Sequence, residues 1–118
     1  MSQSLEHRIM LTKGREGWEA DTHVDLGGEY ILRVFTMKRY SGDLVTTATR
    51  MKKTAGEFLG LSFIMHQDFN TVVRSQRVRV TSRAVELQHK AALEEIESIK
   101  ARMNAFYADK TQQEACYA

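Results

Sequence analysis

The spacing of apolar residues changes once along the chain, at Thr81. Before Thr81, apolar and polar residues alternate in short runs separated by glycine-containing turns, which is typical of antiparallel strands. After Thr81, apolar residues recur every three or four positions in a segment without glycine or proline, which is typical of a helix. This order predicts an α+β fold: an antiparallel meander of five or six strands, followed by one long C-terminal helix packed on one face.

The clearest strand pattern covers residues 18–26, where alternate side chains should point to opposite faces of a sheet. One set is Trp18, Ala20, Thr22, Val24 and Leu26, and the other is Glu19, Asp21, His23 and Asp25. Further strands are predicted near residues 9–12 and at residues 30–40, 44–53, 58–65 and 71–80.

Gly27-Gly28 and Ser41-Gly42 have the composition of two-residue hairpin turns. Turn length sets the register of a hairpin, and the register decides which side chains share a face. With two-residue turns, the face that the helix should cover carries Trp18, Val24, Ile31, Arg33, Phe35, Met37, Ala48, Arg50, Leu59, Leu61, Phe63 and Met65. The other face carries Tyr30, Leu32, Val34, Thr36, Lys38, Val45, Thr47, Thr49, Met51, Lys53, Phe58, Ser62 and Ile64.

The helix is predicted over about residues 82–108, with Thr81 or Ser82 as its N-cap. Such a helix is about 40 Å long, whereas a ten-residue strand spans about 33 Å, so the helix should extend past the sheet. A heptad stripe runs along it through Val85, His89, Ala92, Ile96, Ile99, Met103 and Phe106. A stripe of this regularity favours helix pairing, and it predicts a homodimer built partly through these residues.

The chain has 118 residues, which favours one domain, predicted at residues 1–110 with a frayed polar tail at 111–118. No apolar run is long enough to span a membrane, so no membrane association is expected. Cys116 is the only cysteine, which excludes an intrachain disulfide and fits a cytoplasmic location. The sequence contains no Walker loop, dinucleotide fingerprint or nucleophile elbow, so neither a cofactor nor catalysis is expected.

Basic residues concentrate in the middle of the chain, although the net charge is only +2. Basic side chains on neighbouring strands can follow a phosphate backbone, and exposed aromatic rings can stack on bases. The predicted phosphate-binding residues are Lys38, Arg50, Lys52, Lys53, Arg74, Arg77, Arg79 and Arg83. Tyr30, Phe58 and Tyr40 are the candidates for base stacking. The alternative is that these side chains form a solvated surface, in which arginines protect an exposed edge strand from aggregation.

Three functions remain open on these grounds. The favoured one is non-enzymatic binding of nucleic acid, single-stranded and with little sequence preference, by a dimer. The second is a protein–protein interaction module, such as an adaptor, chaperone or inhibitor, that uses its sheet face or its C-terminal helix. The third is a small metal-dependent enzyme in which Asp21, His23 and Asp25 provide ligands, with His66 or His89 as a further ligand. The histidine spacing matches no paired metal motif, so no metal site is predicted.

Overall fold

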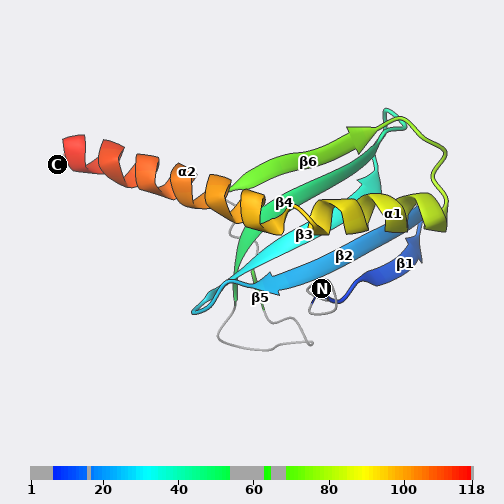
Figure 1. Cartoon of the computed structure of the whole chain (residues 1–118), viewed down its shortest axis with the longest axis horizontal. Coiled ribbons are helices and arrows are strands. Elements are labelled where there is room, and N and C mark those ends of the chain that lie inside the picture. The colour runs from blue at the N-terminus through cyan, green and yellow to red at the C-terminus, as the bar shows by residue number, and fades with distance from the viewer. Residues whose placement is uncertain (1–6, 16, 54–62, 65–68, 118) are drawn as a thin grey trace.

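The computed structural model describes residues 7–15, 17–53, 63–64 and 69–117 (Figure 1). Within these ranges six strands form one antiparallel sheet, and two helices follow them, which confirms the α+β fold. The strands are β1 (Met10–Gly14), β2 (Gly17–Asp25), β3 (Tyr30–Lys38), β4 (Leu44–Lys53), β5 (Phe63–Ile64) and β6 (Asn70–Gln76). The helices are α1 (Ser82–Leu93) and α2 (Ile96–Tyr117). In the part of the chain described, neither helix is long and apolar enough to cross a membrane.

The predicted meander holds for β1 to β5, each of which pairs antiparallel with the next strand in the chain. It does not hold for β6, which pairs antiparallel with β4. β5 pairs with Lys52 and Lys53, and β6 pairs with residues 44–49. β5 and β6 therefore run in the same direction. β6 ends at the same end of the sheet as the β3–β4 turn (Figure 1).

Both hairpin turns that flank β3 are one residue longer than the two-residue turns predicted from the sequence. Between β2 and β3, Leu26 N donates to Tyr30 O at 3.1 Å, which leaves residues 27–29 as the loop. Between β3 and β4, Arg39 N donates to Asp43 O at 2.9 Å, which leaves residues 40–42. Glycine is required in these loops, since Gly28 has a φ of 61° and Gly42 a φ of 93°.

The extra residue in each turn inverts the predicted faces of β3. Val24 lies opposite Leu32, and Val34 lies opposite Ala48, so these four residues share the face beneath the helices. Ile31, Arg33, Phe35 and Met37 therefore lie on the opposite face, which we call the far face, and their assignment to the covered face was wrong. The two offsets cancel across β3, which is why Val24 and Ala48 were placed correctly.

Buried side chains on the covered face join the sheet to both helices. The main core cluster consists of Val24, Leu32, Val34, Ala48, Phe69, Ala92, Leu93, Ile96, Ile99 and Met103. A smaller cluster near the start of α1 is formed by Ala20, Leu44 and Val85, with Trp18, Val78 and Val80 packed against it. The core thus lies between the sheet and the helices of the same chain.

The prediction of one continuous helix was wrong, because the helix breaks at Glu94 and Glu95. Glu95 N donates to Ala92 O at 2.9 Å, which closes a tight turn. Ile99 N then donates to Glu95 O, which is the first hydrogen bond of the following helix. Neither glycine nor proline marks the break, so the sequence carries no helix-breaking signal there. The predicted N-cap is confirmed, since the Thr81 hydroxyl accepts from Ala84 N at 3.1 Å. α2 continues past the predicted end at residue 108 and extends beyond the sheet (Figure 1).

Most of the heptad stripe is buried within this one chain. Its buried members, each at most 7% exposed, are Val85, His89, Ala92, Ile96, Ile99 and Met103. These side chains pack on the sheet, so they are unavailable to a second chain, and the prediction that they form a dimer interface is corrected. Phe106, at 41% exposed, is the one stripe position that stays open to solvent.

Candidate functional site

Three connections lie at one end of the sheet: the β1–β2 turn, the β3–β4 turn and residues 77–81 between β6 and α1 (Figure 1). Packing ties them together, because Val78 and Val80 share a cluster with Trp18 of β2. An ion pair adds to this, since Arg77 Nε lies 3.4 Å from Asp43 Oδ1. The basic residues of these connections and their flanks are Lys13, Arg15, Lys38, Arg39, Arg77, Arg79 and Arg83. We call this region the basic end.

Most of the cations at the basic end have no carboxylate partner. Among the residues that the structure describes, no ion pair or hydrogen bond engages the side chains of Arg15, Lys38, Arg39, Arg79 and Arg83. Elsewhere, Lys and Arg side chains pair with Asp or Glu at Arg33, Lys52, Arg74, Lys90 and Lys100. Unpaired charges of one sign on a small surface create a local positive potential that the net charge of +2 conceals.

Residues 77–80 are extended but are not part of the sheet, because β6 ends at Gln76. The prediction of a strand up to residue 80 was therefore too long. Burial still alternates along this segment, since Val78 and Val80 are half-buried while Arg77 and Arg79 are exposed. The two guanidinium groups consequently lie on the solvent side of this segment.

Tyr40 occupies the first position of the three-residue β3–β4 loop and is fully exposed. An aromatic ring without packing partners contributes nothing to the core, whereas it offers a flat surface on which a base can stack. Lys38 and Arg39 immediately precede it and Ser41 follows. The ring thus lies at the basic end, next in sequence to Lys38 and Arg39.

The predicted nucleic-acid-binding residues fall into separate groups in the structure. Lys38, Arg77, Arg79 and Arg83 lie at the basic end. Arg74 pairs with Glu95 near the helix break, with Nε 3.2 Å from Oε2. Phe58 and the side chain of Lys53 lie outside the described residues.

Tyr30, Arg50 and Lys52 lie at the opposite end of the sheet from the basic end. The Arg50 guanidinium lies 3.8 Å from the ring centre of Tyr30 and 4.0 Å from that of Tyr107. Lys52 Nζ lies 3.4 Å from Glu29 Oε1. Arg50 is thereby built into the contact between the sheet and α2, which argues against a role in binding phosphate.

Sequence reasoning missed Lys13, Arg15 and Arg39. Two of them lie in "KGREG", which was interpreted only as a turn, and Arg39 directly precedes the turn at residues 40–42. Alternate turns of an antiparallel meander lie at the same end of a sheet, so the first and third turns could have been grouped from the sequence alone.

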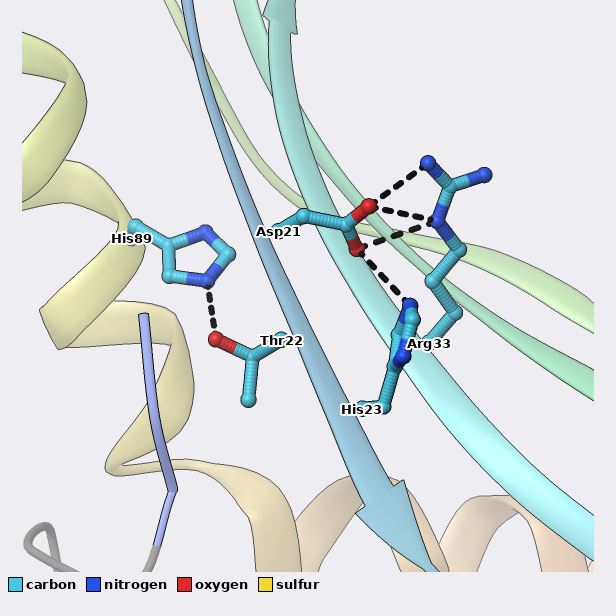
Figure 2. A network of polar contacts seen from close by, with 5 residues as sticks. All are labelled: Asp21, Thr22, His23, Arg33 and His89. Carbon is cyan, nitrogen blue, oxygen red and sulfur yellow. Dashed lines mark hydrogen bonds and ion pairs between the residues drawn. The ribbon is translucent and has the colours of Figure 1, made fainter. Parts of the chain in front are cut away.

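The acidic strand face of β2 does not form a metal site in the described part of the chain. The Asp21 carboxylate binds Arg33 through Nε at 3.0 Å and Nη2 at 2.7 Å, and His23 Nε2 lies 3.5 Å away (Figure 2). His89 lies on the other side of β2, where it contacts Thr22 (Figure 2). No group of three His, Cys, Asp or Glu side chains is close enough to hold a metal among these residues. His66, the other proposed ligand, lies outside the described residues.

A buried polar network connects α1 to three strands on the covered face. His89 contacts the Thr22 hydroxyl through Nε2 and the Thr36 hydroxyl through Nδ1, each at 2.8 Å. Thr36 contacts Thr46 at 2.6 Å, and Gln88 Nε2 donates to Thr46 at 3.0 Å. Burial lowers the pKa of His89 to about 4, against the opposing effect of the Asp21 charge. His89 is therefore a neutral structural residue and not part of an exposed site.

Searches against protein-family models, curated proteins and solved structures return no match for this chain. The site must therefore be interpreted from its own geometry and charge.

Proposed function

We propose that this protein is a non-enzymatic nucleic-acid-binding protein that holds the phosphate backbone at its basic end. The observation that carries the proposal is the group of unpaired cations at the same end of the sheet as the exposed ring of Tyr40. Cations without internal partners bind phosphates and release the counterions that surround a nucleic acid, which favours binding. Backbone contacts of this kind carry little sequence information, so weak sequence preference is expected.

Tyr40 favours single strands over duplexes. The faces of bases inside a duplex are covered by their neighbours, whereas an unpaired base can stack on an exposed aromatic ring. A ring at the tip of a hairpin, flanked by Lys38 and Arg39, can contact a base while both cations reach adjacent phosphates. The favoured ligand is therefore single-stranded DNA or RNA.

The first test is fluorescence anisotropy with labelled single-stranded DNA, duplex DNA and RNA at salt concentrations from about 50 to about 200 mM. Binding should weaken steeply with salt. The variant Arg79→Gln/Arg83→Gln should bind more weakly, and its salt slope should be shallower by about 1.4, since each lost contact to a single strand removes about 0.7. These two residues are chosen because neither takes part in an ion pair in the described structure.

The matched control is Arg102→Gln/Lys110→Gln, which removes the same charge from exposed positions on α2. It should leave both affinity and salt slope close to those of the unmodified protein. Absence of binding at low salt, or equal effects of the two double variants, would refute the proposal. Salt-independent binding to a protein partner would instead support the alternative of a protein-interaction module.

We further propose that the protein acts as a dimer in the cytoplasm. The stripe positions that remain available for self-association are at the exposed part of α2, beginning with Phe106. Phe106 contacts Phe69, with ring centres 5.7 Å apart, yet keeps an exposed side. A dimer formed there would leave both basic ends free, because they lie at the opposite end of the sheet (Figure 1).

A further inference from the structure

The far face of the sheet is hollowed next to the basic end. Among the described residues, a first hollow of about 400 Å³ borders Met37, Lys38, Arg39, Tyr40 and Ser41. A second, of about 210 Å³, borders Arg33, Phe35, Met37, Arg39, Val45, Thr47, Thr49, Met51 and Asn70. Met37 and Arg39 border both, so the two hollows are neighbours along β3.

The wall of the second hollow is held rigid by an ion pair. The guanidinium of Arg33 lies 4.3 Å from the ring centre of Phe35, and the Asp21 carboxylate fixes it with contacts to both Nε and Nη2. Asp21 also neutralises the charge of Arg33. The wall therefore offers a flat, preorganised surface and no free positive charge, which disfavours a phosphate as the occupant.

The remaining side chains of the second hollow combine apolar surface with uncharged hydrogen-bonding groups. Phe35 and Met37 provide the apolar surface, and Thr47 provides a hydroxyl. Thr49 donates to Asn70 Oδ1 at 3.0 Å, which orients the Asn70 amide. Apolar faces with polar edges are the properties of a nucleobase, which stacks with its plane and forms hydrogen bonds with its edge.

Size limits the occupant further. Pockets for drug-sized ligands measure roughly 300–1,000 Å³. At about 210 Å³ the second hollow is smaller, so it suits one ring system and not a complete cofactor. Arg39 stands at its border with the first hollow, where the phosphate attached to such a ring would lie.

We infer that the second hollow holds one unpaired nucleobase of a strand whose phosphates lie on the basic end, with Arg39 connecting the two. This inference rests on the proposed function and makes it more specific. It requires a single strand, because a base within a duplex cannot enter the hollow. Arg33 and Phe35 stack against the base, while Thr47 and Asn70 contact its edge.

The test compares an oligothymidine with an oligomer of the same length that lacks bases and keeps all phosphates. The normal oligomer should bind at least about tenfold more tightly, because its bases stack both in the hollow and on Tyr40. Thr47→Phe, which fills the hollow, should weaken binding of the normal oligomer about tenfold and leave abasic binding unchanged, and any remaining preference for the normal oligomer should come from Tyr40. Asn70→Ala, a milder change, should weaken only the base-containing oligomer.

Thr12→Phe is the matched control, because Thr12 is exposed on β1 and does not border the hollow. It should not change the binding of either oligomer. If both oligomers bind equally well, the inference is overturned together with base stacking on Tyr40, while phosphate binding at the basic end stands. If neither binds, the proposed function itself fails. If the normal oligomer binds more tightly but is insensitive to Thr47→Phe and Asn70→Ala, the base is held elsewhere and the inference is overturned.

Discussion

At the scale of single residues, the buried polar network predicts the tautomer of His89. Gln88 Nε2 donates to Leu44 O and to Thr46, because the amide nitrogen can only donate. Since the Thr46 hydroxyl accepts this bond, we expect it to donate to Thr36, and Thr36 to donate to His89 Nδ1. This arrangement places the proton of the neutral imidazole on Nε2, which then donates to Thr22. Nitrogen NMR at about neutral pH should show the Nε2–H tautomer for His89, and the Nδ1–H tautomer would contradict this chain of donors.

Removing one hydroxyl from this network should destabilise the protein. Thr36→Val keeps the side-chain shape, but it removes one of the two side-chain partners of the Thr46 hydroxyl and leaves His89 Nδ1 without its partner in the core. The free energy of unfolding should fall by about 1–3 kcal/mol, measured by urea denaturation. Thr12→Val, at an exposed position on β1, should change it by less than about 0.5 kcal/mol. Equal effects of the two variants would show that the network contributes nothing.

The low pKa of His89 makes stability depend on pH. Its value of about 4 lies below the 6.5 of an unfolded histidine, so between these values the unfolded state binds more protons. The contribution is therefore fully present above about pH 6.5 and is lost as pH falls towards about 4. Between about pH 7 and about pH 4.5 the loss should be on the order of 2–3 kcal/mol. Carboxylates also titrate there, so the measurement is the difference in this loss between the unmodified protein and His89→Gln.

At the scale of elements, the sequence predicted where strands and helices lie better than how they connect. Alternation located β2, whose buried and exposed side chains alternate, whereas the high content of β-branched and aromatic residues located β3 and β4. Turn length was not predictable, since "LGGEY" and "RYSGD" suit both two-residue and three-residue loops. The break at Glu94 and Glu95 was also hidden, because helix propensity there is high and neither glycine nor proline marks it.

The attachment of α2 to the sheet depends on Tyr107 and Arg50. Tyr107 lies over the Arg50 guanidinium, and its ring centre is 6.4 Å from that of Phe69. Tyr107→Ala should remove about 1–2 kcal/mol of this contact and increase hydrogen exchange at amides 104–110. Exchange in α1 should stay unchanged. Leu87→Ala, at an exposed position on α1, is the control. If amides 104–110 stay protected from exchange in Tyr107→Ala, other contacts hold α2 on the sheet.

At the scale of the whole molecule, the proposed site depends on the position of β6. A simple six-stranded meander would send the last strand to the other end of the sheet, away from Arg39 and Tyr40. Because β5 and β6 both pair with β4, residues 77–83 come to the end where the β3–β4 turn lies (Figure 1). The residues of the basic end could be listed from the sequence in part, but their assembly required this pairing, which no local pattern encodes.

Self-association is predicted to use the exposed end of α2. The unmodified protein should sediment at twice its mass of 13.5 kDa, and Phe106→Glu should sediment as a monomer, since a charge at this contact must be desolvated. Leu87→Glu, which changes an exposed leucine on α1, should remain dimeric. A monomeric unmodified protein would remove dimerisation from the proposal and leave the basic end unaffected.

The three-residue turns on both sides of β3 also determine where this chain can change length in evolution. Loss of Glu29 would leave Gly27-Gly28 between Leu26 and Tyr30, and these two residues would still lie opposite each other, so every later side chain would keep its face. Loss of one residue within β3 would instead shift the rest of that strand by one position and exchange residues such as Val34 and Phe35 between the two faces. Homologous chains should therefore differ in length in the two loops and keep the length of β3.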